Sequence, residues 1–175
     1  MIRLQLNGQT VEALPGETLL QLAQREGIDV PHLCYKAGLE AAGNCRACVV
    51  EVEGERTLAA SCCRQAAAGM VVQTNSNKAI AAQKMVLELL LADMPRQVNP
   101  NKLKADNELT HWCQQMGIQS TRFEARASVS ADLSHPAIAV NMDQCIQCTR
   151  CVRACREVQV NDVIGLAFRG EHATV

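Results

Sequence analysis

The sequence predicts an α+β protein: a small β-sheet that grasps one helix, then a helical region, then a cysteine-rich C-terminal segment. Three observations lead to this fold class. Polar and apolar residues alternate as in strands within residues 1–77, apolar residues recur at helical spacing in residues 77–93, and most of the ten cysteines stand in two groups. With 175 residues, the chain can form one ordinary domain or two small ones.

The first part, residues 1–77, is expected to follow the order β-β-α-loop-β-β-β. Asn7-Gly8 between two alternating segments is the strongest short signal for a hairpin, and Gly27 marks the C-terminal end of the helix. Strand patterns and a further turn follow the loop. The segments that carry these elements are residues 2–6, 10–14, 17–28, 48–62 and 70–74.

The middle part, residues 78–134, is expected to be a helical connector. Residues 77–93 predict an amphipathic helix. The apolar face expected on it consists of Ala82, Met85, Val86, Leu89 and Leu90. Pro95 and Pro100 interrupt the helical pattern, which resumes over residues 101–118, and residues 119–140 are expected to be polar and irregular.

Composition and charge give no support for a nucleic-acid-binding, membrane-spanning or exported protein. A formal net charge of −1 gives no reason to expect nucleic acid or an anionic membrane as a partner. The most apolar segment, residues 79–92, is shorter than the ~20 residues of a membrane span, and the polar and apolar alternation of residues 1–16 gives no reason to expect an export signal. We therefore expect a soluble, cytoplasmic protein, in which clustered cysteines are metal ligands rather than a disulfide framework.

The first cysteine group has the spacing C-x10-C-x2-C-x13-C. Its members are Cys34, Cys45, Cys48 and Cys62. Three come from one loop and the fourth from beyond a hairpin, which is typical of a plant-type [2Fe-2S] site with a longer first gap. Small residues in this loop, with Gly43 as a backbone-permissive point, would let N–H groups approach the sulfurs.

A structural zinc site with four cysteines is the alternative for this group, although such sites usually present two C-x2-C pairs. The fourth position has an alternative as well. Cys63 stands beside Cys62, and neighbouring side chains on a strand point to opposite faces, so only one of the two can face the metal.

The second group has the spacing C-x2-C-x2-C-x3-C, and we expect its first three cysteines, Cys145, Cys148 and Cys151, to bind a [4Fe-4S] cluster. Cys155 is expected to serve a second [4Fe-4S] cluster, whose other three thiolates would lie beyond Val175. Alternatively, Cys155 closes the first cubane or stays unligated. Three arginines interleave with these cysteines and are expected either to raise the cluster's reduction potential or to form an exposed basic face. They are Arg150, Arg153 and Arg156.

The stretch "PHLCYKAGLEAAGNCRACVVEVEGERTLAASC" resembles the N-terminal [2Fe-2S] domain of the large iron-sulfur subunit of respiratory complex I. Related domains occur in diaphorase subunits of NAD-linked hydrogenases and in alpha subunits of NAD-linked molybdenum or tungsten formate dehydrogenases. The resemblance covers the whole chain and implies a β-grasp fold for residues 1–77, with Cys62 as the fourth ligand. It implies the first half of a bacterial-type [4Fe-4S] ferredoxin domain for residues 135–175.

The chain departs from complex I and the hydrogenases in its middle region, where those proteins bind a cluster through one histidine and three cysteines. Only His111 and Cys113 are available here, so we expect a scaffold without a cofactor, with Cys113 buried and His111 a surface or capping residue. The segment from Asp132 to His172 resembles formate dehydrogenase alpha subunits most closely.

No residue set suits substrate chemistry, so no catalytic residue is expected in this chain. The resemblance implies an electron-transfer segment of an NAD-dependent formate dehydrogenase. Its partners would be a flavin/NAD-binding subunit and a small [2Fe-2S] subunit, with FMN and NAD on those partners and molybdopterin in a domain of the same subunit. The alternatives are an iron-sulfur diaphorase subunit of a hydrogenase or complex I, and a zinc-stabilised interaction module.

Overall fold

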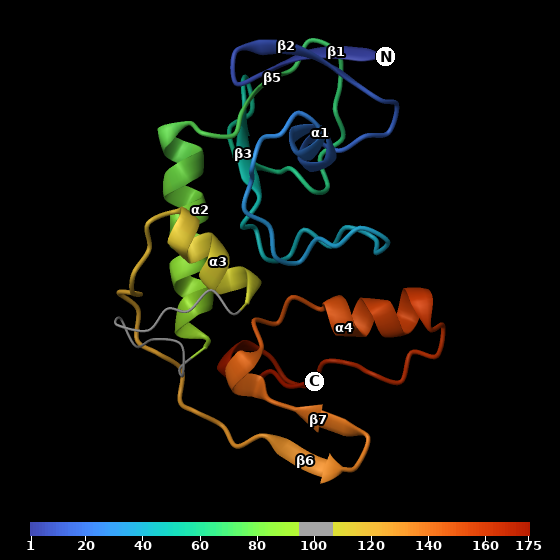
Figure 1. Ribbon diagram of the computed structural model, residues 1–175, viewed down its shortest axis with the longest axis vertical. Coiled ribbons are helices and arrows are strands. Elements are labelled where there is room, and N and C mark those ends of the chain that lie inside the picture. The colour runs from blue at the N-terminus through green and yellow to red at the C-terminus, as the bar shows by residue number, and fades with distance from the viewer. Residues whose placement is uncertain (95–106) are drawn as a thin grey trace. The chain divides into compact units, whose positions relative to one another are not determined.

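The computed structural model describes residues 1–94 and 107–175, and contacts divide the chain into two compact units (Figure 1). The first unit comprises residues 1–36 and 41–86, and the second comprises residues 37–40 and 87–175. The first unit contains β1 (Ile2–Leu6), β2 (Gln9–Ala13), α1 (Leu19–Arg25), β3 (Val49–Val52), β4 (Ala59–Ala60), β5 (Val71–Gln73) and most of α2 (Asn77–Ala92). The second contains α3 (Glu108–Gln115), β6 (Asp132–His135), β7 (Ile138–Val140), η2 (Met142–Gln144), α4 (Arg150–Arg153), η3 (Ala154–Val158) and η4 (Gly170–His172).

The first unit confirms the predicted element order and builds a mixed five-stranded sheet in the order β2-β1-β5-β3-β4. β1 and β2 form the expected antiparallel hairpin, and Asn7 and Gly8 turn the chain with φ of 50° and 82°. β5 pairs with β1 in parallel and with β3 in antiparallel, so the last strand closes the centre of the sheet. β5 thereby joins the hairpin that precedes α1 to the strands that follow it.

Helix α1 lies against this sheet and supplies the middle of the hydrophobic core (Figure 1). Leu19, Leu20, Leu22 and Ala23 are buried together with inward-facing residues of the strands. Thr18 and Gln21 form a capping box at its N-terminus, and Gly27 with φ of 71° ends it as predicted. Burial of each large aliphatic side chain contributes about 1.5–3 kcal/mol, which lets a core with few aromatics hold the sheet and helix together.

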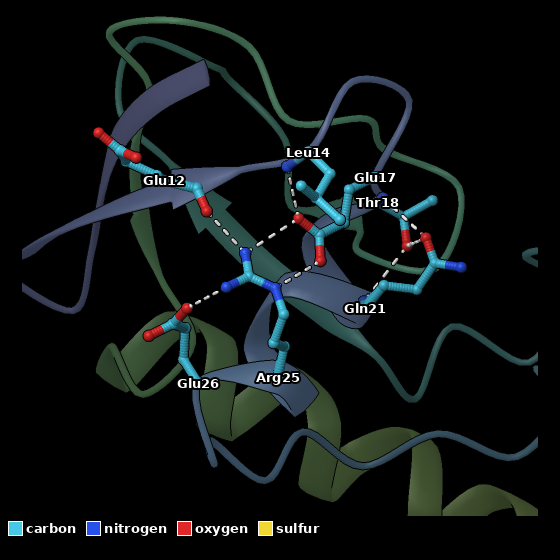
Figure 2. A network of polar contacts seen from close by, with 7 residues as sticks. All are labelled: Glu12, Leu14, Glu17, Thr18, Gln21, Arg25 and Glu26. Carbon is cyan, nitrogen blue, oxygen red and sulfur yellow. Dashed lines mark hydrogen bonds and ion pairs between the residues drawn. The ribbon is translucent and has the colours of Figure 1, made fainter. Parts of the chain in front are cut away.

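A polar network ties α1 to β2 on the outside of this core (Figure 2). Arg25 donates to both carboxylate oxygens of Glu17 at 3.0 and 3.1 Å, to Glu26 at 2.7 Å and to the backbone oxygen of Glu12 at 2.6 Å. The Arg25 guanidinium holds the pKa of Glu17 below its usual value. The pKa of Arg25 is raised in turn, chiefly by the same carboxylate.

Helix α2 begins where expected, but the predicted buried face is wrong. Met85 and Leu89 are 39% and 46% exposed, respectively. Four buried positions follow each other at intervals of four residues and are Ala79, Gln83, Leu87 and Leu91, and Ala92 at the end of the helix is buried as well. A polar residue occupies this stripe because the Gln83 amide donates to the backbone oxygens of Val49 at 2.9 Å and Thr74 at 3.3 Å.

In the second unit, α3 confirms the C-terminal part of the second predicted helix, with Asn107 as its N-cap and Gly117 as its stop. The part of that prediction over residues 101–106, with Pro95 and Pro100, lies outside the described residues. Residues 119–140 are not wholly irregular, because β6 and β7 pair as a short antiparallel hairpin. Within the described residues, no helix is long and apolar enough to cross a membrane.

Candidate metal centres

The four cysteines of the first group come together although they are separated in the sequence. The Cys34 thiol contacts those of Cys45 and Cys62, and the Cys62 thiol also contacts that of Cys48. Cys34, Cys48 and Cys62 are buried, and Cys45 is half-buried. The loop after α1 supplies Cys34, the segment that enters β3 supplies Cys45 and Cys48, and the turn after β4 supplies Cys62.

Hydrogen bonds between the thiols are the main cause of the pKa shifts in this group. Donation from Cys45, and then from Cys62, lowers the pKa of Cys34 to about 2, and donation from Cys62 lowers the pKa of Cys48 to about 6. The pKa values of the two donors are raised for the same reason. Bound metal cations would compensate the charge of four thiolates at this spacing.

The thiol contacts run from Cys45 to Cys34, from Cys34 to Cys62 and from Cys62 to Cys48. Two pairs of thiolates are what a [2Fe-2S] rhomb requires, because each of its irons takes two cysteines. A single zinc ion would instead need all four sulfurs around one point. The four gathered thiols can supply two ligands to each iron of such a cluster.

The backbone around these cysteines is held in conformations that bring N–H groups and sulfurs together. The Cys34 amide donates to the Cys45 sulfur at 3.4 Å. Arg46, which lies between Cys45 and Cys48 in the sequence, has φ of 59°. Positive φ at a residue other than glycine is uncommon and concentrates at functional sites. The buried Ser61 hydroxyl donates to the backbone oxygen of Cys48 at 2.7 Å and so links the segments that carry two of the cysteines.

Cys63 lies at the edge of this group. Its side chain is exposed, with its sulfur 3.6 Å from the Cys62 sulfur and 3.7 Å from the backbone oxygen of Ala41. Gly43 passes so close that a Cβ there would lie 2.8 Å from the Cys63 sulfur. Of the two neighbours, Cys62 is the one whose thiol contacts those of Cys34 and Cys48, and its role as the fourth ligand stays a prediction.

The second group lies in the second unit, where Cys145 and Cys148 are half-buried and Cys151 is exposed. Burial raises the pKa of Cys145, and the nearby thiols of Cys148 and Cys151 raise it further. The Gln147 amide donates to the Cys145 sulfur at 3.4 Å. Gln147 and Thr149 have φ of 53° and 61°, so a left-handed residue stands on each side of Cys148 and bends the chain. These three cysteines could hold three corners of a cubane.

Cys155 is buried in the π-helical turn η3 and its surroundings differ from those of the other three. Its thiol donates to the side-chain oxygen of Asn161 at 2.8 Å. The prediction that Cys155 serves a second cluster stays a prediction.

The three arginines between these cysteines have separate partners. Arg150 pairs with Glu108, and Arg156 lies 3.0 Å from Asp162. Arg153 is buried and donates to the backbone oxygen of Glu40, so it does not belong to an exposed basic face. The sequence pattern missed this because helical spacing does not show which residues lie against a helix from elsewhere in the chain.

Sequence reasoning also overlooked Arg126, which is isolated in a polar segment and carries no motif. Its side chain is 7% exposed and donates to the backbone oxygen of Met142. The same oxygen accepts the Cys145 amide at 3.1 Å. Arg126 is therefore a buried cation next to the backbone of a candidate ligand.

His111 and Cys113 lie on α3 and match the expected surroundings. Cys113 is fully buried and His111 is exposed. Burial raises the pKa of the Cys113 thiol to about 11, with the Glu88 carboxylate adding to the shift. Its thiolate, the form that binds metals, is thus disfavoured. The ten cysteines, all within the described residues, carry thiols rather than disulfides.

Comparison with known families agrees with this geometry. Residues 1–77 match the family described as a 2Fe-2S iron-sulfur cluster binding domain. This part of the chain is a 2Fe-2S ferredoxin-like domain. The C-terminal region, residues 135–175, matches the ferredoxin-like domain of NADH-quinone oxidoreductase subunit 3, which confirms the predicted α+β fold of a 2Fe-2S domain followed by a ferredoxin-like region.

Similarity to individual proteins extends beyond the 2Fe-2S domain to the whole chain. One NADH-quinone oxidoreductase subunit of Rickettsia prowazekii is 35% identical over 176 residues, which cover 100% of this chain and 26% of that protein. The HndD subunit of the NADP-reducing hydrogenase of Solidesulfovibrio fructosivorans is 37% identical over 100% of this chain and 31% of that protein. The chain thus spans about a third or less of these relatives.

A solved structure has the same architecture. A chain of the NAD+-reducing [NiFe]-hydrogenase in its H2-reduced state aligns with a TM-score of 0.85 and 28% identity, over 98% of this chain and 73% of that chain. The fold of this chain is therefore that of a protein found in an NAD-linked oxidoreductase.

Proposed function

We propose that the chain is an iron-sulfur electron-transfer segment of an NAD(P)-linked oxidoreductase of the type formed by NADH-quinone oxidoreductase and NAD(P)-reducing hydrogenases. The convergence of the Cys34, Cys45, Cys48 and Cys62 thiols carries the proposal. Similarity to subunits of these complexes over the whole chain supports it. A plant-type [2Fe-2S] centre has a reduction potential near about −400 mV, which suits electron exchange with nicotinamide through a flavin.

The 2Fe-2S domain would hold its cluster with Cys34 and Cys45 on one iron and Cys48 and Cys62 on the other. Cys145, Cys148 and Cys151 would hold a [4Fe-4S] cluster in the C-terminal region, with Cys155 as a ligand of a second one. The clusters supply one-electron redox chemistry when bound. The chain's own residues bury Cys34, Cys48 and Cys62 and direct N–H groups at the sulfurs of Cys45 and Cys145, and both effects would tune the potentials.

The test compares two adjacent cysteines after anaerobic reconstitution of the full chain with iron and sulfide. We expect Cys62→Ser to lose about two irons per chain together with the [2Fe-2S] paramagnetic resonance signal, because Cys62 lies among the other sulfurs. Cys63→Ser, the matched control, keeps both. A colourless, zinc-loaded wild-type protein, or equal losses in the two variants, contradicts the proposal.

A formate dehydrogenase remains the second candidate, and one observation favours it. Residues 64–131 contain a single His and a single Cys, His111 and Cys113, and these are too few to bind a further four-iron cluster. Purification of the native complex decides between the candidates. Formate-dependent reduction of NAD+ with bound molybdenum or tungsten would establish the formate dehydrogenase, whereas hydrogen- or quinone-linked activity would exclude it.

Further parts of the proposal concern partners and location. A flavin/NAD-binding subunit and a small [2Fe-2S] subunit are the expected partners, with FMN and NAD on those subunits. Molybdopterin belongs only to the formate dehydrogenase alternative. Exposure to a reducing cytoplasm would suit thiols that hold clusters instead of forming disulfides. Residues 78–134 would serve as a scaffold without a cofactor of its own.

A further inference from the structure

A buried charged pair lies next to the second cysteine group. Asp143, in the turn η2, is fully buried, and its carboxylate accepts hydrogen bonds from the Ser128 hydroxyl and from the Val129 amide, the latter at 2.9 Å. Arg126 lies 4.0 Å from the same carboxylate, with its side chain 7% exposed. The segment 126–129 thus closes over the turn that precedes Cys145.

Backbone contacts connect this pair to Cys145. The Met142 oxygen accepts both the Arg126 guanidinium and, at 3.1 Å, the Cys145 amide. Asp143 stands two residues before Cys145 in the sequence. The buried Nε of Arg126 has no hydrogen-bond partner among the described residues, so the guanidinium keeps an unused donor. A buried charge without full hydrogen bonding acts strongly on its surroundings because little water screens it.

We propose that Arg126 and Asp143 form a buried, charge-compensated pair that sets the reduction potential of the [4Fe-4S] cluster held by Cys145, Cys148 and Cys151. The inference rests on the proposed function, because it needs that cluster. Neither residue contacts a substrate, and both act as positioning residues. The Arg126 charge compensates the Asp143 carboxylate, and its guanidinium donates to the Met142 oxygen that also accepts the Cys145 amide.

The charges of Arg126 and Asp143 have opposite effects on the reduction potential of the cluster. A thiolate-ligated cubane is anionic and gains one more negative charge on reduction, so a nearby positive charge favours the reduced state and a negative charge opposes it. Loss of Arg126 leaves a buried carboxylate uncompensated, and loss of the Asp143 charge leaves a guanidinium uncompensated.

The experiment is a redox titration of the reconstituted full chain, followed by paramagnetic resonance. Arg126→Gln is expected to lower the cubane midpoint, with at least a tenfold fall in the ratio of reduced to oxidised cluster at the wild-type midpoint, or about 59 mV for one electron. Asp143→Asn is expected to raise it. The double variant is expected to return within about threefold of the wild-type ratio, because both charges are gone. The [2Fe-2S] signal of the same sample serves as an internal reference.

Arg122→Gln is the matched control, because Arg122 is 65% exposed and pairs with Glu88 at 2.7 Å in the same unit. Equal shifts in the Arg122 and Arg126 variants, or shifts of the same sign in the Arg126 and Asp143 variants, overturn the inference. If Arg126→Gln retains no cluster, Arg126→Lys decides: a wild-type midpoint supports the charge mechanism, and a lowered midpoint refutes it. Wild-type protein without any cubane signal would instead overturn the proposed function, and the inference with it.

Discussion

Gln83 makes a sharp prediction because it is the one polar side chain in the buried stripe of α2. It is 2% exposed and its amide joins the backbone oxygens of Val49, in β3, and Thr74, after β5. Gln83→Met keeps the approximate volume and removes both donors. Each lost hydrogen bond costs about 1 kcal/mol net, so the first unit loses about 2 kcal/mol or more of its free energy of unfolding.

Urea denaturation followed by circular dichroism measures this loss. With a slope of about 1 kcal/mol per M for a unit of this size, the midpoint of Gln83→Met falls by about 2 M. Gln73→Met is the matched control, since Gln73 is exposed on β5 and its replacement leaves buried carbonyls untouched. If the two variants unfold at the same urea concentration, Gln83 does not anchor α2 to the sheet and the reasoning fails.

Three further predictions concern single residues. Gly43→Ala is expected to cost about 1 kcal/mol or more, because φ there is +62° and the new Cβ meets the Cys63 sulfur; thermal denaturation measures it. Glu17→Gln is expected to destabilise the 2Fe-2S domain fully above about pH 4.3, the pKa of an unfolded Glu, and progressively less at lower pH. Arg25 holds the pKa of Glu17 in the folded protein below that value. The stabilisation by the ion pair in the wild-type protein therefore disappears as the pH falls through the folded pKa. Cys113→Ala is expected to cost about 1 kcal/mol of stability and to leave the iron content unchanged.

Each of these has an outcome that contradicts it. For Gly43, adding Cys63→Ala removes the steric part, so a double variant no more stable than Gly43→Ala refutes the close contact. A Glu17→Gln stability difference that is constant from pH 3 to pH 7, measured by urea midpoints, refutes the ion pair. Loss of iron on replacement of Cys113 shows that α3 does carry a ligand.

Local patterns in the sequence were enough to predict the order of helices and strands in the 2Fe-2S domain. The hairpin at Asn7-Gly8, helix α1 and the stop at Gly27 follow from backbone preferences that act over a few residues, and the structure confirms them. Cysteine spacing likewise predicted the first group of thiols, because three of them come from one loop and the fourth from beyond a hairpin. The choice of Cys62 over Cys63 followed from the family resemblance, and the fold agrees by placing only Cys62 among Cys34 and Cys48.

The buried face of α2 shows where such patterns stop. Apolar periodicity favoured Met85 and Leu89, which are exposed, and gave no hint of Gln83. The β6–β7 hairpin was missed for a related reason, since its residues are mostly exposed and its strands are short. In both cases the deciding partner lies far away in the sequence or is solvent.

By itself, the sequence determined the fold class, the order of elements in the first unit and the two groups of cysteines, because turn chemistry, helical period and ligand spacing are local properties. Only the tertiary structure decided that Gln83 bridges two backbone oxygens and that Arg126 and Asp143 lie buried beside Cys145. A buried polar group is stable only with its partners in place, and those partners are brought to it by the folded chain.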